Sequence, residues 1–376
     1  MLRITLLIFL VLAIYPFKVR AQVQKDSLVI SDTQFYYPNP NPFDFNRLFI
    51  DSFPIVAVGD IMLGSNYPNA SYLPPHDGQF LLDSVLPFLK SNGPVFGNLE
   101  GTYLNTQGPT SKNCKDPNKC YAFRSPEHYM GYVKKAGFNV VSLANNHSGD
   151  FGMDGRKTTM ALADSAGIRY AGLESCPYSI FEQNGLTYGF AAFAPNSGCQ
   201  QLNNLANAIA IVNHLDSLCD IIIISFHGGA EGSKYQHVAA GTEYYLGENR
   251  GNLRHFTHTL IDHGADVILG HGPHVTRGME VYKDRFIAYS LGNFATYGRF
   301  NLVGPNGLCP LLQLSTDKEG KFLSGKIVPI HQVGEGIPMY DEQLRVIPIL
   351  QKLSKEDFPK TCPVISNQGD ILPPTE

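Results

Sequence analysis

The sequence predicts an α/β fold, and two observations carry that prediction. Short apolar runs rich in β-branched residues recur along the chain, and each ends in glycine and polar residues, as a strand does where it meets a loop. Four segments with helical periodicity lie between several of these runs and close with glycine, a common helix stop. Strands that alternate with helices of this length are typical of α/β proteins.

The six expected strands lie, in order, within FPIVAVGDIMLG, GPVFGNLEG, FNVVSLANNHSGD, CDIIIISFHGGAEG, ADVILGHGPHV and RFIAYSLGNF. The expected helices cover residues 77–93, 125–137, 155–167 and 252–264. From about residue 304 onward the pattern changes to strands and to loops broken by proline. We therefore expect one domain over residues 53–303, followed by a C-terminal extension of strands and loops, residues 304–376, that packs on it.

Composition supports a globular chain with one large domain. The 376 residues are 43% hydrophobic and 16% charged, and that charged fraction is below the usual value of about a quarter. Such a composition excludes a coiled coil or a charged linker. Residues 22–52, which include YYPNPNPFD, are polar and rich in proline and asparagine, so we expect an extended leader without a core of its own.

The first 21 residues have the pattern of a secretory signal peptide. Arg3 is followed by an apolar run over residues 4–17, and small residues precede Gln22. The alternative is a membrane anchor, but a run of about fourteen residues is shorter than the roughly twenty that span a bilayer. We expect an exported protein, periplasmic, cell-surface or extracellular, with no integral membrane span after cleavage.

Charge and cysteine content fit export. Cleavage removes three basic residues and no acidic one, so the formal net charge goes from −4 to −7. A mildly acidic chain is not built to bind nucleic acid through its phosphates. The seven cysteines make disulfides possible outside the cytoplasm, with Cys219 expected as a buried free thiol. The candidate pairs are Cys114–Cys120, Cys176–Cys199 and Cys309–Cys362.

Residues with ligand-type side chains gather at the ends of the expected strands. A single histidine after a strand is more often packed than functional. Five strand ends that each carry such residues would converge if the strands lie in one sheet, and oxygen and imidazole ligands together suit two divalent metals. The residues are Asp60, Asn98, Glu100, Asn145, Asn146, His147, Asp150, His227, Glu231, His271, His274 and Asn293.

The order of six motifs resembles a known family. GDIMLG, GNLEG, LANNHSGDFGMDG, SFHGGAEG, GHGPHV and YSLGNF are similar to those of the CapA family, the capsule and poly-γ-glutamate synthesis proteins of the metallo-dependent phosphatase (calcineurin-like) superfamily. The resemblance extends from about Ile55 to Phe294. It implies a four-layer sandwich in which two mixed β-sheets are flanked by helices.

The resemblance also implies roles for single residues. Asp60 and His274 would bind a first metal, and Glu100 would stand in the place of the bridging carboxylate. The second metal would be held by Asn146, His227 and His271. His147 would donate a proton to the leaving group, and Asp150 would hold its imidazole in the required tautomer.

One position departs from the pattern of the superfamily. Asp-x-His is usual at the first motif, whereas this chain has Met62 two residues after Asp60. A thioether is a poor ligand in an oxygen-rich site for Mn²⁺, Mg²⁺ or Zn²⁺. We therefore expect one or two divalent ions of open identity (Mn, Zn or Mg), with the first held weakly or absent.

Four further residues are candidates for substrate contact: Asn98, Glu231, Asn293 and Arg124. For Glu231 and Asn293 the alternative is a loop-building hydrogen bond. For Arg124 the alternatives are helix capping and a surface ion pair.

The resemblance implies a secreted, metal-dependent hydrolase-like protein. It would act in synthesis, release or trimming of an extracellular polymer, by metal-activated water with His147 as proton donor, on a phosphoester or an amide bond. The expected partners are an extracellular anionic polymer or capsule precursor and the capsule-export machinery. Two alternatives stay open: a non-catalytic polymer-binding or export-complex accessory protein on the same fold, and a phosphoesterase for a small substrate.

Overall fold

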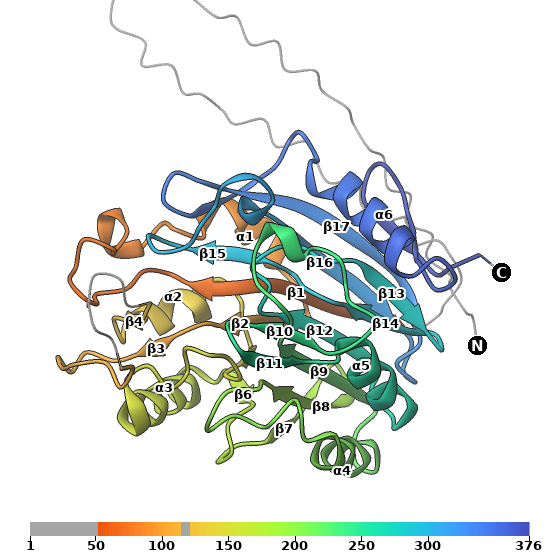
Figure 1. Cartoon of the computed structure of the whole chain (residues 1–376), viewed down its shortest axis with the longest axis horizontal. Helices are drawn as coiled ribbons and strands as arrows, with labels where there is room; N and C mark the ends of the chain where they lie inside the picture. Colours follow the sequence, from red (N-terminus) through yellow and green to blue (C-terminus); the bar gives the residue numbers. More distant parts are fainter. Residues whose placement is uncertain (1–51, 114–120, 376) are drawn as a thin grey trace, which may run out of the picture. The chain divides into compact units, whose positions relative to one another are not determined.

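The computed structural model describes residues 52–113 and 121–375. The predicted signal peptide, nearly all of the predicted leader and the Cys114–Cys120 pair lie outside these residues. Within them, two mixed β-sheets pack face to face and helices cover them (Figure 1). The predicted α/β architecture of two mixed sheets flanked by helices is confirmed. No helix in the described ranges is long and apolar enough to cross a membrane.

The larger sheet has ten strands in the order β19-β20-β17-β16-β1-β2-β5-β6, with β15 paired to β1 and β18 to β17. The strands from β1 to β6 along this path run parallel, whereas β16 and β17 are antiparallel to their neighbours. The bounds are β1 Phe53–Met62, β2 Val95–Leu99, β5 Val140–Ser142, β6 Arg169–Ala171, β15 Asn293–Thr296, β16 Leu308–Thr316, β17 Phe322–Val333, β18 Ile337–Tyr340, β19 Val364–Ile365 and β20 Asp370–Leu372.

The smaller sheet has six strands in the order β13-β14-β12-β9-β8-β7. Its central strands β8, β9, β12 and β14 are parallel, and both edge strands are antiparallel to their neighbours. The bounds are β7 Tyr178–Gln183, β8 Leu186–Phe193, β9 Ile221–His227, β12 Val267–His271, β13 Met279–Tyr282 and β14 Arg285–Ala288. Two short pairs complete the strands: β3 Thr102–Tyr103 with β4 Arg124–Ser125, and β10 Glu243–Tyr245 with β11 Glu248–Gly251.

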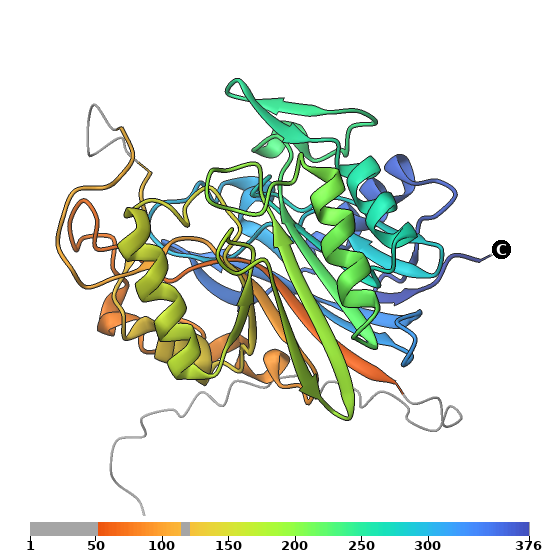
Figure 2. The ribbon, with the colours of Figure 1, turned by 90° about the horizontal axis from the view of Figure 1, so that it is seen from below.

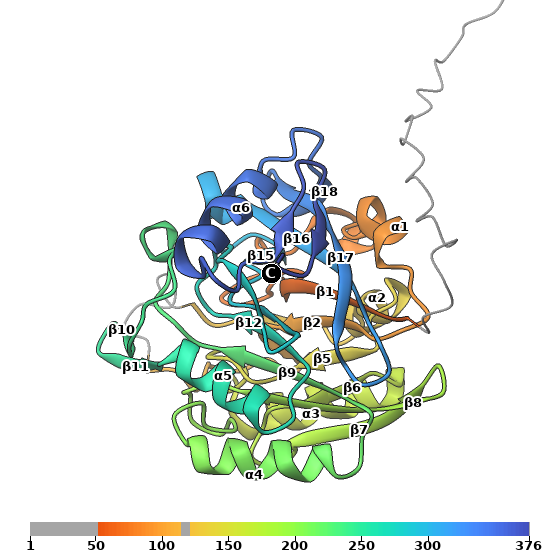
Figure 3. The ribbon, with the colours of Figure 1, turned by 90° about the vertical axis from the view of Figure 1, so that its right-hand side faces the viewer.

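Helices lie on the outer faces of the sheets. α4 (Leu205–Asp216) contacts β8 and β9 and also α5 (Leu253–Asp262), and the two helices lie beside each other against the smaller sheet (Figures 2 and 3). α6 (Val346–Asp357) packs on β16 and β17 of the larger sheet. The remaining elements are α1 Leu86–Leu89, α2 Tyr129–Lys135, α3 Gly152–Ala166 and the 3₁₀ turns η1 Pro75–Gly78, η2 Asp83–Val85, η4 Ser233–Tyr235 and η5 Gly304–Gly307.

Residues 221–224, four consecutive isoleucines, explain why β9 is buried on both faces. Side chains alternate along a strand, so Ile221 and Ile223 enter the core that both sheets share. Ile222 and Ile224 join the second core, beneath α4 and α5. A continuous apolar run is typical of a strand that is covered on both sides, and this one places β9 at the centre of the fold.

Three of the expected helices form, but the segment over residues 77–93 does not become one helix. It contains only the end of η1, the turn η2 and the four-residue α1. Pro87 has no N–H to donate to the carbonyl of Asp83, so a regular helix cannot run through this position. The segment after residue 304, expected as strands and loops, also contains helix α6.

Two predicted disulfides are wrong, because the thiols are free. The Cys199 thiol points to the Asn145 carbonyl and the Ser148 hydroxyl, whereas the Cys176 thiol points to the carbonyls of Tyr170 and Tyr178. Cys309 is fully buried in β16, and Cys362 lies beyond α6 with its thiol directed at a neighbouring carbonyl. Cys219 is free, as predicted, and half-buried.

Candidate functional site

The carboxyl ends of the parallel strands bring the predicted ligand residues together. On β1, Asp60 is in register with Asn98 of β2 and with Asn293 of β15. In the smaller sheet, His227 at the end of β9 is in register with His271 at the end of β12. Parallel strands open at the same edge of a sheet, so each sheet presents its polar side chains to one place.

The centre of the site is a cluster of buried Asp60, buried Glu100 and partly buried His274, whose ligand atoms lie within 4.8 Å of one another. His274 Nδ1 lies 3.1 Å from Asp60 Oδ2, and its Nε2 lies 3.5 Å from Glu100 Oε1. His271 Nδ1 lies 3.1 Å from the other Asp60 oxygen. Two buried carboxylates and two imidazoles are a donor set that suits a divalent cation.

Asparagine amides orient this cluster. Asn98 is fully buried and donates from Nδ2 to Asp60 Oδ1 at 2.8 Å, while Asn145 Nδ2 donates to Asn98 Oδ1 at 3.1 Å. On the other side, Asn293 Oδ1 lies 3.1 Å from His274 Nδ1. Asn306 Nδ2 donates to the His274 carbonyl. These contacts fix the carboxylate and the imidazole that form the cluster.

Buried atoms without partners surround the cluster. Asn146 Oδ1, both ring nitrogens of His227 and His271 Nε2 are buried, and none has a hydrogen-bond partner among the described residues. An unsatisfied buried polar group is costly, so such groups are normally paired. All four atoms are good metal ligands, and all belong to residues for which the family resemblance implies the second metal. These residues therefore fit a bound divalent cation.

Burial and charge shift the ionisation of the cluster in opposite directions. Burial acts to raise the pKa of Asp60, but hydrogen bonds from His271 and His274 lower it well below its usual value. Burial, reinforced by the charge of Asp60, raises the pKa of Glu100 well above its usual value. Burial alone would lower the pKa of His274, but Glu100 and Asp60 raise it to about 10. A divalent cation bound between these carboxylates would compete with a proton for His274.

His147 and Asp150 form the predicted imidazole–carboxylate pair. His147 Nδ1 lies 2.8 Å from Asp150 Oδ2, and Nε2 lies 3.9 Å from Glu100 Oε1. The ring stacks on Phe123 at a centroid distance of 4.1 Å. Burial lowers the pKa of His147 to about 4, with the charge of Lys112 acting in the same direction and Asp150 opposing both. Asp150 therefore fixes the ring so that Nε2 faces the cluster.

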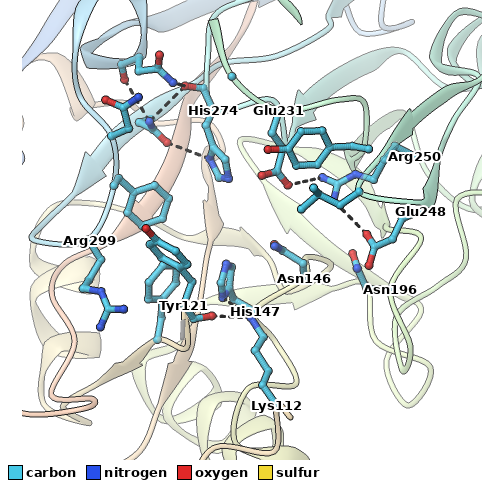
Figure 4. Close-up of a pocket in the computed structure, with 18 residues that line it drawn as sticks. Lys112, Tyr121, Asn146, His147, Asn196, Glu231, Glu248, Arg250, His274 and Arg299 are labelled. Atoms are coloured by element: carbon cyan, nitrogen blue, oxygen red, sulfur yellow. Dashed lines mark hydrogen bonds and ion pairs between the residues drawn. The ribbon is translucent and has the colours of Figure 1, made fainter. Parts of the chain in front are cut away.

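A pocket of about 570 Å³ opens over these residues (Figure 4). His147, Asn146 and His274 form part of its wall, and Glu231 faces them from the loop that follows β9. Arg250 of β11, itself buried, pairs with Glu231 at 3.1 Å and with Glu248 at 3.4 Å. The residues that line the pocket are Lys112, Tyr121, Phe123, Asn146, His147, Asn196, Glu231, Gly232, Tyr245, Leu246, Glu248, Arg250, His274, Asn293, Arg299, Phe300, Asn301 and Asn306.

The four candidates for substrate contact fall into two groups. Glu231 and Asn293 line the pocket, although Glu231 is paired with Arg250 and Asn293 contacts His274. Asn98 and Arg124 are not among the lining residues. Asn98 is fully buried and donates to Asp60. Arg124 donates to Asn66, Gln107 and two backbone carbonyls, so it organises the loop over residues 105–108.

The sequence did not point to several residues of the site. Lys112 lies 2.8 Å from Asp150, and Phe123 both stacks on His147 and donates its N–H to Asp150. Arg250 and Asn306 come close to the other site residues only in the folded chain. None of these four follows an apolar run at the end of a parallel strand, which was the signal that found the others.

Similarity to known proteins covers most of the described chain. The family model described as "Bacterial capsule synthesis protein PGA_cap" matches residues 54–297. The chain is 29% identical over 259 residues to a capsule biosynthesis protein CapA of Bacillus anthracis, covering 64% of this chain and 59% of that protein. It is 27% identical over 320 residues to a PGA biosynthesis protein CapA of Bacillus subtilis, covering 80% of this chain and 77% of that protein.

Among solved structures, a putative 5′-nucleotidase from Staphylococcus aureus in complex with alpha-ketoglutarate is 14% identical, with a TM-score of 0.42. The similarity covers 81% of this chain and 58% of that one.

Proposed function

Because this chain belongs to the family of bacterial capsule synthesis proteins, PGA_cap, we propose that it acts on an extracellular polymer of the capsule or poly-γ-glutamate kind. Its role would be in synthesis, release or trimming of that polymer. Relatives named for capsule and PGA biosynthesis support the proposal. The matched segment, residues 54–297, contains every strand end that contributes to the site.

The reaction we propose is metal-dependent hydrolysis. Asp60, Glu100 and His274 would hold one divalent cation, and Asn146, His227 and His271 would hold a second with Glu100 between them. A divalent cation supplies Lewis acidity that makes water a better nucleophile at neutral pH. The single observation that carries this proposal is the set of buried, unpartnered ligand atoms on Asn146, His227 and His271.

His147 would supply the proton that the leaving atom needs, and Nε2 must first take up that proton from the attacking water, because burial lowers the pKa of the ring to about 4. Its ring is fixed by Asp150 and Phe123, and Nε2 is directed toward the cluster. A positioned acid of this kind contributes about 10²–10⁴-fold in rate.

Oxygen and imidazole ligands are compatible with Mn, Zn or Mg, and the same arrangement serves a phosphoester or an amide bond. The expected partners are the polymer or its precursor and the capsule-export machinery, in an exported protein.

One observation favours a different function on the same fold. Met62, buried in β1, occupies the position where the superfamily has a ligand histidine. A protein that holds its first metal weakly could serve as a non-catalytic polymer-binding or export-complex accessory. The His147–Asp150 pair argues for the hydrolase, because a pure binding protein has no need of a positioned acid. A phosphoesterase for a small substrate would use the same residues.

Metal analysis of the purified protein tests the proposal directly. We expect the native chain to hold about one or two equivalents of divalent metal, and a His271→Ala/His274→Ala variant to hold little. A His76→Ala/His255→Ala variant, which changes two exposed histidines, is the matched control. Phosphoesters and γ-glutamyl polymer would then be compared as substrates. A native chain that stays empty after incubation with Mn²⁺ and Zn²⁺ would exclude the hydrolase and leave polymer binding.

A further inference from the structure

Lys112 makes three close contacts beside the proposed proton donor (Figure 4). Its ammonium nitrogen lies 2.8 Å from Asp150 Oδ1 and 3.1 Å from His147 Nδ1. It also donates to the carbonyl of Tyr121 at 2.7 Å. The lysine side chain is one third exposed, whereas Asp150 is fully buried. Because His147 Nδ1–H donates to Asp150, the ammonium and this N–H are both donors, so the lysine is held by the Asp150 carboxylate and the Tyr121 carbonyl.

The contacts of Asp150 show what Lys112 does there. One carboxylate oxygen, Oδ2, accepts from the Phe123 N–H at 2.7 Å and lies 2.8 Å from His147 Nδ1. The other oxygen, Oδ1, pairs with Lys112. Within the described ranges, Lys112 is the only lysine or arginine that pairs with Asp150. A buried carboxylate that loses its only cation becomes an uncompensated charge, which favours a different rotamer or protonation.

Lys112 also contacts residue 121, which lies beside His147 in the wall of the pocket (Figure 4). Tyr121 lines the pocket and is exposed, and its carbonyl accepts a hydrogen bond from Lys112. One side chain thus links the segment that carries Lys112, residue 121 and the loop of His147 and Asp150. Lys112 thus stabilises the position of the Asp150 carboxylate, and through it the His147 ring, from a segment outside the loop that contains these two residues.

We propose that Lys112 is a positioning residue: it holds the Asp150 carboxylate in the orientation that keeps His147 Nε2 directed into the pocket. The proposal rests on the proposed function for the role of His147, but the geometry of the ring can be measured without any substrate. The competing explanation is that Lys112, which lines the pocket, binds an anionic group of the substrate directly.

The test uses the full chain with ¹⁵N-labelled histidine and three variants. Lys112→Met removes the charge and keeps the length, and Lys112→Arg keeps the charge. Lys157→Met removes the charge of an exposed lysine on α3 and is the matched control. A His147→Gln variant assigns the His147 ring signals. Thermal unfolding of each variant establishes that it is folded before its spectrum is compared.

We expect the His147 Nδ1–H signal to shift or to be lost through exchange in Lys112→Met, and to persist in Lys112→Arg and Lys157→Met. With a hydrolysed substrate, kcat of Lys112→Met should fall about 10- to 100-fold, as for other residues that orient a functional group. KM should change by no more than about twofold, since the interaction acts on the transition state.

Two results would overturn the proposal. One is an unchanged His147 signal in folded Lys112→Met. The other is a rise in KM with kcat retained, which would assign Lys112 to substrate binding. If the native chain hydrolyses nothing, the proposed function fails, but the ring signal still decides the role of Lys112.

Discussion

Uncharged residues orient the charged ones at this site. Asp60 receives its closest amide contact from Asn98, and Asn98 is held in turn by Asn145. An amide fixes a carboxylate without adding charge, so the ligand stays anionic and available to a cation. Residues of this kind, which hold ligands in place, have a large effect on metal affinity.

Replacing Asn98 with alanine should therefore weaken metal binding without removing a ligand. We expect about a 10- to 100-fold loss of affinity. The lost donor should also cost about 1–3 kcal/mol in the free energy of unfolding, because a buried acceptor loses its partner. Metal titration calorimetry and urea unfolding measure the two effects. Asn203→Ala, at an exposed position, should change neither, and an Asn98→Ala protein with native affinity would contradict this account.

The sequence predicted the site residues that have a local signal and missed those that do not. Asp60, His227 and His271 each close or nearly close a buried strand, so an apolar run followed by a polar residue marks them. Lys112 and Arg250 lie outside such runs, and only tertiary contacts bring them to the pocket. Arg124 shows the opposite case: the sequence made it a candidate for substrate contact, but its hydrogen bonds go to Asn66 and to the loop over residues 105–108.

At the scale of elements, proline explains two of the three differences between the expected and the observed helices; the third, α4, was not among the expected segments. Pro87 interrupts the segment over residues 77–93, which consists of short turns. Pro348 lies in the first turn of α6, where its missing N–H has no partner to lose, so the helix continues to Asp357. Proline prevents a helix where it would lie in the helix interior, and it is tolerated where it lies in the first turn.

The approach of β1 to the chain before β15 gives a prediction at this scale. A Cβ atom at Gly59 would lie 1.9 Å from the carbonyl oxygen of Gly292, whereas a Cβ atom at Gly131 of α2 would meet nothing within 4 Å. Gly59→Ala should therefore destabilise by about 1–3 kcal/mol or more through overpacking beside Asp60. The same change at exposed Gly131 should stabilise by about 0.5–1 kcal/mol, because alanine is the better helix former.

Urea unfolding of the two variants beside the native chain measures both effects, and the pair controls for the substitution itself. Opposite signs are the expected outcome. Equal or native-like midpoints would mean that β1 and the segment at residue 292 can separate without cost. In that case the position of Asp60 would depend less on this contact than its register with Asn293 indicates.

At the scale of the whole described fold, the candidate ligands come from both sheets. Asp60 lies near the end of β1 and Glu100 directly follows β2, both in the larger sheet, whereas His227 and His271 end strands of the smaller one. The apolar core between the sheets holds them together below the site. A cation bound by both sets would join the sheets at their polar edge, where that core ends.

Metal binding should therefore raise the thermal stability of the fold as a unit. A ligand that binds only the folded state at about 100 times its Kd stabilises by about 2.7 kcal/mol. In a domain of this size that corresponds to an increase of several degrees in Tm. Chelation should lower Tm of the native chain by that amount, and added Mn²⁺ or Zn²⁺ should restore it. The His271→Ala/His274→Ala variant should be insensitive to both. A native chain that loses its metal with no change in Tm would contradict this account, because an ion that binds only the folded state must stabilise it.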